Sequence, residues 1–402
     1  MSDLPESPRV AHFVETLTAG GAEMLAMRIS GVLADRGWGA HLVVARADGP
    51  LRCRVPETVR LGDLGCDRNG GGPAGALAYF LSLRRRLEAY LRVNRIDVLQ
   101  CHLPMANFLG LVMARRQVCP VLPTVHNERE FDYGGRGSWL RRPLRKAAYR
   151  RLLHSCSAMV AVSEQARTAM IGALGADEEE ARRIVVIPNG VPAGPRAGKH
   201  ERAAARTRWN IPGDAVLIVG MGRLTAQKDF PHADRGARRD RRDEPRLAMC
   251  HRRRGRAAFA AEQLARSLGI SQRCRFAGHV DNTAELLRAA DVFCLPSTFE
   301  GMPLAVLEAM SHDLPVIATD LPVLAELVQD GLSGRLVPVG DSGRLAGALR
   351  EAVADEARRR QWGHTAGEAV RRRHDLDVVV DRLEAIYREA RASRRGENVV
   401  AD

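Results

Sequence analysis

Residues 299–310 read Phe-Glu-Gly-Met-Pro-Leu-Ala-Val-Leu-Glu-Ala-Met and mark the junction of a loop with an apolar helix. Pro303 suits the first turn of that helix because its missing N–H would have no intrahelical partner there, and apolar residues follow at helical spacing. We therefore expect Glu300 in the loop before the helix and Glu308 about two turns inside it. The helix start suits a diphosphate, and the carboxylates can accept hydrogen bonds from hydroxyls on either side. Taken alone, the pair could also be an acidic cap and an exposed helical glutamate.

Short apolar runs alternate with helical patterns along the whole chain, as in β-α units around a parallel sheet. The first series starts with a strand at Val10–Val14 and a helix at 21–36, and the second restarts at Ala215–Gly220. We expect an α/β fold of two doubly wound, Rossmann-like domains with parallel sheets facing a central cleft. The expected parts are an N-terminal domain (1–190), a Pro- and Gly-rich linker (191–213), a C-terminal domain (214–375), and a helix and tail that cross back to the N-terminal domain (376–402).

The composition narrows the class of protein. The 402 residues are 45% apolar, enough for two domains with full cores. No run of 18 apolar residues occurs and the N-terminus lacks the apolar stretch of a signal peptide, so a cytoplasmic location is expected. The eight cysteines include no Cys-x-x-Cys pair, which opposes a zinc site and a disulfide framework.

Two loops after strands carry groups suited to phosphate. Gly20 and Gly21 follow the first strand and open a helix, so backbone N–H groups can approach an anion there. Arg223 and Lys228 follow the first strand of the second half, and both cations can bind phosphate oxygens. Taken separately, the first loop could be a plain strand-to-helix turn and the second a solvated basic loop.

In combination, these segments resemble the retaining glycosyltransferases of family 4. The matching motifs, spread over about residues 10–350, are Gly-Gly-Ala-Glu (20–23), Val-Ala-Val-Ser-Glu (160–164), Val-Ile-Pro-Asn-Gly-Val (186–191), Gly-Arg-Leu with Gln-Lys-Asp (222–229), Phe-x-Gly (276–278) and Glu-x7-Glu (300–308). The resemblance implies a GT-B fold whose C-terminal domain holds a UDP- or GDP-sugar. It also implies an N-terminal domain that holds a saccharide or polyprenyl-linked acceptor in surface polysaccharide or glycolipid biosynthesis.

The resemblance also assigns roles to individual residues. Glu300 and His126 are the implied catalytic residues beside the transferred sugar, while Glu308 would hold the ribose hydroxyls and Arg223 and Lys228 the diphosphate. The other implied donor-binding residues are Gly20, Gly21, Phe276, Gly278, Met302, Pro303, Leu304 and Ala305. Two cations and a helix N-terminus can stabilise a diphosphate leaving group, so no metal site and no cofactor is expected. A histidine at a strand end could also be a structural residue.

One segment departs from the family pattern. Ten arginines and four acidic residues lie between His232 and Arg256, so this segment contributes +6 to the net charge of +13. The pattern requires an amphipathic helix and an apolar strand there. Permitted codons read one nucleotide later can encode Thr-Leu-Ile-Glu-Ala and Val-Ile-Ala-Gly-Glu-Gly. We hypothesise that residues 232–241 and 250–258 are frameshifted. We then expect the second domain to lack a helix and a strand, to fold poorly and to have little activity.

Two other functions fit parts of the sequence. A catalytically impaired basic protein could bind nucleic acid through these arginines, but no aromatic residues interleave them, so nucleic acid is not an expected partner. A sugar-nucleotide epimerase of the same architecture is the second alternative, and turnover that requires an acceptor would distinguish a transferase from both.

The segment Trp139–Leu153 combines six cations with tryptophan, leucine and tyrosine side chains. Such a segment can lie on anionic lipid beside a lipid-linked acceptor, so we expect peripheral binding to the inner face of the membrane. A solvated helix face is the alternative.

Overall fold

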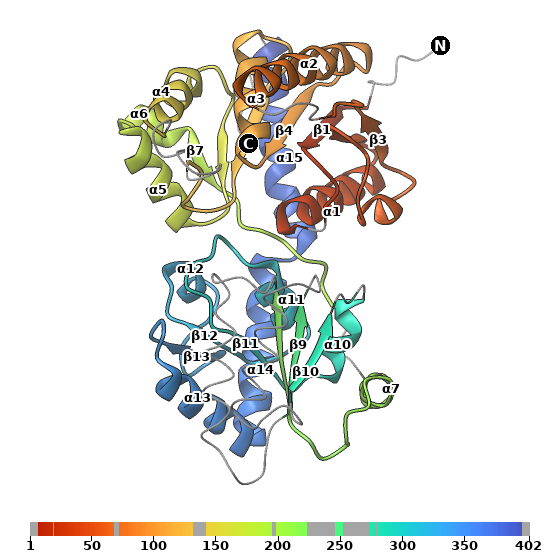
Figure 1. Ribbon diagram of the computed structural model, residues 1–402, viewed down its shortest axis with the longest axis vertical. Coiled ribbons are helices and arrows are strands. Elements are labelled where there is room, and N and C mark those ends of the chain that lie inside the picture. The colour runs from red at the N-terminus through yellow and green to blue at the C-terminus, as the bar shows by residue number, and fades with distance from the viewer. Residues whose placement is uncertain are drawn as a thin grey trace. The chain divides into compact units, whose positions relative to one another are not determined.

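The computed structural model describes residues 7–18, 20–67, 72–131, 142–194, 198–222, 246–251, 274–278, 280 and 282–395. The chain divides into two units, each with its own parallel sheet and helices (Figure 1). Unit 1 is Met1–Asn189 with Leu376–Asp402, and unit 2 is Gly190–Asp375. Among the described helices, none has both the length and the apolar character that crossing a bilayer requires.

Unit 1 is built on a seven-stranded sheet with the order β3-β2-β1-β4-β5-β6-β7, in which all pairs are parallel. Its strands are β1 Arg9–Val14, β2 Gly39–Val44, β3 Arg60–Asp63, β4 Val98–His102, β5 Val121–Val125, β6 Met159–Ala161 and β7 Ile184–Val186. The order reverses beside β1, as in a doubly wound sheet. Most strand residues are apolar because helices bury both faces of such a sheet.

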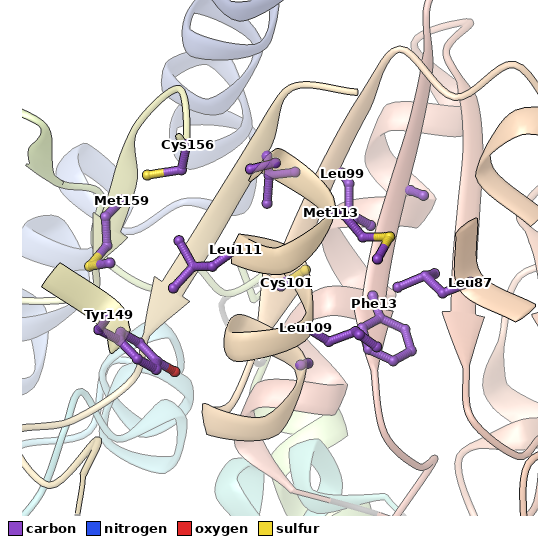
Figure 2. Packing of buried hydrophobic residues seen from close by; sticks show 14 of the residues in the cluster. Phe13, Leu87, Leu99, Cys101, Leu109, Leu111, Met113, Tyr149, Cys156 and Met159 are labelled. Carbon is purple, nitrogen blue, oxygen red and sulfur yellow. The ribbon is translucent and has the colours of Figure 1, made fainter. Parts of the chain in front are cut away.

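The helices of unit 1 cover the two faces of this sheet. They are α1 Gly21–Asp35, α2 Gly72–Val93, α3 Pro104–Arg115, α4 Arg142–Leu153, α5 Glu164–Leu174, α6 Glu178–Arg182 and α15 Leu376–Arg395, with a short 3-10 helix at Arg52–Arg54. Leu87 of α2 and Leu109 and Met113 of α3 pack with Phe13 of β1 in a hydrophobic core cluster of unit 1 (Figure 2). Side chains alternate along a strand, so His12 lies on the opposite face.

The C-terminal helix α15 is part of unit 1, although it follows unit 2 in the sequence. It contacts α1 and β4. Arg36, at the end of α1, holds it through ion pairs with Asp377 at 2.7 Å, Asp381 at 2.6 Å and Glu384 at 3.1 Å. One guanidinium therefore fixes three acidic side chains along one face of α15.

Unit 2 is built on a six-stranded parallel sheet with the order β10-β9-β8-β11-β12-β13. Its strands are β8 Leu217–Gly222, β9 Arg246–His251, β10 Cys274–Gly278, β11 Val292–Leu295, β12 Val316–Thr319 and β13 Gly334–Val337. Its helices are α7 Lys199–Arg208, α10 Thr283–Ala289, α11 Leu304–Ser311, α12 Pro322–Ala325, α13 Ser342–Ala354 and α14 Glu356–Arg373.

The segment 191–213, expected as a linker, contains the helix α7 and packs into unit 2. Arg206 of α7 is buried and forms an ion pair with Asp291 at 3.1 Å. Its guanidinium also donates to the carbonyl oxygens of Ala289 at 3.2 Å and Pro212 at 2.5 Å. Both terminal nitrogens of this buried arginine are thus hydrogen-bonded inside the fold of unit 2.

The strand expected to be missing from unit 2 is present. β9 pairs in parallel with β8 from Arg246, opposite Leu217, to His251, opposite Gly222, and its other edge pairs with β10. The sequence Leu-Ala-Met-Cys inside it suits a central strand, and the run Arg252–Arg254 comes after its last residue. The expectation that the arginines would remove this strand was therefore wrong. Residues 232–241, where a helix was expected to be missing, lie outside the described residues.

Candidate active site

Glu300 lies in the loop between β11 and α11, as the sequence predicted. Its side chain is buried, and its Oε1 accepts a hydrogen bond from Ser297 Oγ at 2.5 Å. The carbonyl oxygen of Ser297 in turn accepts from Thr319 Oγ1, also at 2.5 Å, at the end of β12. The carboxylate is therefore held in one orientation at the carboxyl edge of the sheet, where open α/β folds bind ligands.

Helix α11 begins one residue later than its sequence predicts. Pro303 is its N-cap, with extended backbone at φ −73° and ψ 114°, and Leu304 is the first helical residue. Glu308 is consequently in the second turn, closer to the helix start than the two turns expected, and its side chain is half-buried. The N–H groups of Leu304 and Ala305 have no intrahelical acceptor, because the first turn of any helix leaves them over. The helix end that could bind an anion is thus formed by residues that lie between Glu300 and Glu308 in the sequence.

The other expected donor-binding residues of unit 2 differ in burial and in the element that carries them. Met302 is buried beside the N-cap of α11. Phe276 of β10 is half-buried and packs against the core of unit 2, whereas Gly278 ends the strand with φ +69°, a left-handed conformation that favours glycine. Arg223 and Lys228 follow β8, but both lie outside the described residues.

The Gly20 loop of unit 1 holds a carboxylate at the helix end where a phosphate was expected. Gly20 is the N-cap of α1, and its carbonyl oxygen accepts from Met24 N at 3.1 Å. Glu23 folds back over it and is buried, and its Oε1 accepts from Thr18 Oγ1 at 2.8 Å. A Cβ atom at Gly20 would lie 2.0 Å from Glu23 Oε2, so glycine makes room for this carboxylate. A phosphate could bind here only after Glu23 moves, since both anions favour the same N-terminus.

His126 directly follows β5 and joins a chain of buried aromatic side chains. Its Nε2 lies 3.1 Å from Nδ1 of His102, and Nε2 of His102 lies 3.0 Å from Nδ1 of His12. Burial lowers the pKa of His126 to about 4 and that of His12 to about 3, and it holds the pKa of His102 well below its usual range. All three imidazoles are therefore neutral at pH 7.

Sequence reasoning did not identify Glu23, His12 or His102. The only signal for the two histidines was their polarity inside apolar strands. The sheet order makes them neighbours, since β1 pairs with β4 and β4 with β5. Within the part of the chain that the structure describes, no three His, Cys, Asp or Glu side chains are arranged to hold a metal ion.

Two family models match adjacent parts of the chain. The model described as "Glycosyltransferase Family 4" matches residues 19–194, and the one described as "Glycosyl transferases group 1" matches residues 201–369. Among curated relatives, the phosphatidyl-myo-inositol mannosyltransferase of Mycolicibacterium smegmatis is 27% identical over 387 residues, which are 92% of this chain and 90% of that protein. The match therefore extends through both units.

Two solved structures are similar to this fold over nearly its whole length. Sucrose-phosphate synthase from Thermosynechococcus elongatus has a TM-score of 0.80 at 20% identity, covering 96% of this chain and all (100%) of that chain. Anabaena HepE in complex with UDP-glucose also has a TM-score of 0.80, at 19% identity, covering 95% of this chain and 99% of that chain. At such identities the likeness concerns the fold alone.

Proposed function

Since the chain belongs to glycosyltransferase family 4 and has the GT-B fold, we propose that it transfers a sugar, with retention, from a UDP- or GDP-sugar to a saccharide or lipid-linked acceptor. The observation that carries the proposal is the orientation of Glu300. Its buried carboxylate is held by a hydrogen bond from Ser297, in the loop that leads into α11. The first residue of α11, Leu304, lies one helical turn before Glu308. A fixed carboxylate next to a positive helix end suits a sugar on one side and a phosphate on the other.

The proposed chemistry relies on stabilising the departing diphosphate. The N–H groups at the start of α11 would bind it together with Arg223 and Lys228, and such electrostatic stabilisation is strongest when the groups are oriented before the reaction. Glu308 would accept hydrogen bonds from the ribose hydroxyls and Glu300 from the transferred sugar. His126 would contact this sugar as a neutral imidazole, since burial lowers its pKa to about 4. The mechanism needs no metal ion, so activity should persist in EDTA.

The name of the relative from M. smegmatis supports a glycolipid acceptor, because that enzyme is a phosphatidyl-myo-inositol mannosyltransferase. We place the transfer in glycolipid or surface polysaccharide biosynthesis, at the cytoplasmic face of the membrane. Helix α4 would lie on anionic lipid there through Arg142, Arg145 and Lys146, with Leu144, 72% exposed, among them. Residues 132–141, which complete the proposed membrane segment, lie outside the described residues.

Vesicle binding tests the membrane part of the proposal. The wild-type chain should bind vesicles that contain anionic phosphatidylserine and release them at high salt. Substituting glutamine for Arg141, Arg142, Arg145 and Lys146 should abolish this binding. The matched control exchanges four exposed arginines of unit 2 for glutamine and should still bind: Arg344, Arg358, Arg360 and Arg372. Equal binding by both variants would exclude α4 as the contact.

A two-step assay tests the transfer itself. UDP- and GDP-sugars are first screened for thermal stabilisation of the protein, because a ligand of the folded state raises its melting temperature. The stabilising donor is then incubated with and without lipid-linked and saccharide acceptors. A retaining transferase turns it over only with an acceptor present and gives a product with the anomeric configuration of the donor. Conversion of the sugar nucleotide without an acceptor would indicate an epimerase, and no turnover with any acceptor would favour a binding protein.

A further inference from the structure

A hydrogen-bonded chain crosses the core of unit 1 from the C-terminal helix to His126. Tyr387 of α15 has its hydroxyl 3.5 Å from Nε2 of His12 on β1, and His12 contacts His102 on β4 at 3.0 Å. His102 contacts His126 at 3.1 Å. Tyr387, His12 and His102 are each 0% exposed, so bulk water does not compete for the hydrogen bonds among these three.

Gln100 sets the direction of the hydrogen bonds in this chain. Its amide Nε2 donates to Thr124 Oγ1 at 2.8 Å, so its carbonyl Oε1 faces the hydroxyl of Tyr387. An amide oxygen only accepts hydrogen bonds, so Tyr387 donates its single proton to Gln100. Toward His12, the oxygen of Tyr387 can therefore only accept a hydrogen bond. The donor is Nε2 of His12, which must carry a proton.

The proton on His12 then determines the tautomer of each histidine. A neutral imidazole carries one N–H, so protonated Nε2 leaves Nδ1 of His12 as an acceptor. His102 must donate to it from Nε2, which leaves its own Nδ1 as an acceptor. His126 must in turn donate from Nε2. The ring nitrogen of His126 that carries no proton is therefore Nδ1.

We propose that Tyr387, His12 and His102 are positioning residues that hold His126 in the Nε2–H tautomer, so that its Nδ1 accepts a hydrogen bond from a hydroxyl of the bound sugar. The part about the sugar rests on the proposed function, whereas the tautomer rests on the chain alone. The opposite tautomer of His126 would require all three histidines to reverse and the amide of Gln100 to turn over. Since these groups are packed together, the tautomers change together.

Tyr387, the first residue of this hydrogen-bonded chain, is also held in place by contacts with residues other than the histidines. The ring of Tyr387 packs edge-on against Trp38, with centroids 5.8 Å apart. The ion pairs of Arg36 with Asp377 and Glu384 fix the part of α15 that precedes it. Replacing Tyr387 by phenylalanine thus removes the hydroxyl that sets the direction while the ring keeps its packing.

Nitrogen NMR of the protein labelled with 15N-histidine tests the tautomer directly. Nε2 of His126, assigned by its loss in His126→Gln, should carry the proton and Nδ1 should not. Tyr387→Phe should shift the tautomer ratio of His126 about tenfold, the size expected for one buried hydrogen bond. The matched control is Tyr90→Phe, which removes a 2.8 Å bond to another buried histidine, His41, and should leave His126 unchanged. A proton on Nδ1 in the wild type, or an unchanged ratio in Tyr387→Phe, would overturn the proposal.

Kinetics distinguish this proposal from the proposed function. Tyr387→Phe should lower kcat about three- to tenfold with little change in KM for the sugar nucleotide, because the altered tautomer affects orientation and not donor binding. Tyr90→Phe should retain wild-type values. His126→Gln tests the role of the histidine itself, so full activity of that variant would contradict the proposed function while the NMR result still decides the tautomer.

Discussion

Glu130 is a buried carboxyl whose titration should make the stability of unit 1 depend on pH. It is 2% exposed, and its Oε1 accepts hydrogen bonds from Asn107 Nδ2 at 2.7 Å and from the hydroxyl of Tyr149 at 3.2 Å. Burial raises its pKa from 4.5 to about 8, although both hydrogen bonds oppose the rise. The folded protein therefore holds this carboxyl protonated at neutral pH, whereas the unfolded chain ionises it.

The sign of the effect follows from the raised pKa in the folded state. The contribution of Glu130 to stability is fully present below pH 4.5 and is lost as pH rises through about 8. Between pH 5 and pH 8 the loss is about 3 to 4 kcal/mol. Glu130→Gln keeps an acceptor oxygen for Asn107 and Tyr149 but cannot ionise. The free energy of unfolding of the variant, minus that of the wild type, should thus rise by about 3 to 4 kcal/mol from pH 5 to pH 8.

Hydrogen exchange of β5, measured by mass spectrometry, reports the opening of this region without requiring both units to unfold together. Variant and wild type are compared at the same pH, so the intrinsic exchange rates cancel. Glu88→Gln is the matched control, because Arg116 lowers the pKa of Glu88 below 4.5 and its contribution stays constant from pH 5 to pH 8. A difference between Glu130→Gln and wild type that is equal at pH 5 and pH 8 would refute the reasoning.

Three further predictions concern unit 2. Glu308→Ala should weaken binding of the free nucleotide diphosphate by about 10- to 100-fold in calorimetry, and normal affinity of this variant would contradict the ribose role of Glu308. Glu300→Ala should instead lower kcat more than it lowers the affinity for the nucleotide diphosphate. Arg206→Met removes one of the two arginines paired with Asp291, which keeps Arg202 at 2.6 Å. The variant should cost about 1 to 3 kcal/mol in urea unfolding of unit 2, and an unchanged free energy of unfolding would contradict the role given to the pair. Restoring Thr-Leu-Ile-Glu-Ala at 232–236 and Val-Ile-Ala-Gly-Glu-Gly at 250–255 should raise the melting temperature and strengthen nucleotide binding. Gene codons that cannot encode these peptides in the next frame would end the frameshift hypothesis.

Features set by neighbouring residues could be predicted from the sequence. The helix expected at 21–36 begins at Gly21 and ends at Asp35, and the strand expected at Val10–Val14 corresponds to β1. Glu300 is in a loop before a helix, because Pro303 and the following apolar run determine that junction locally. The error at Pro303, which is the N-cap and not a residue of the first turn, is of the size that helix ends usually show.

Features that depend on distant partners could not be predicted in this way. The segment 191–213 was expected to be a linker, and the partner that anchors its Arg206 in unit 2, Asp291, is 85 residues away in the sequence. Glu23 lies in the first turn of α1, and only the return of its side chain over Gly20 places its carboxylate at the helix end. In each case a charged group is buried because the fold supplies its partner.

The histidine chain shows most clearly why part of a site like this one escapes sequence reasoning. The motifs that resemble family 4 are loops at strand ends, where a short run of residues makes a whole binding surface. His12 and His102 instead lie within strands, and they meet because β1 pairs with β4 in a register that places His12 opposite Gln100. Their partner Tyr387 comes from a helix that follows unit 2 in the sequence. The state of His126 therefore depends on sheet order and on the return of the chain to unit 1, neither of which a local pattern encodes.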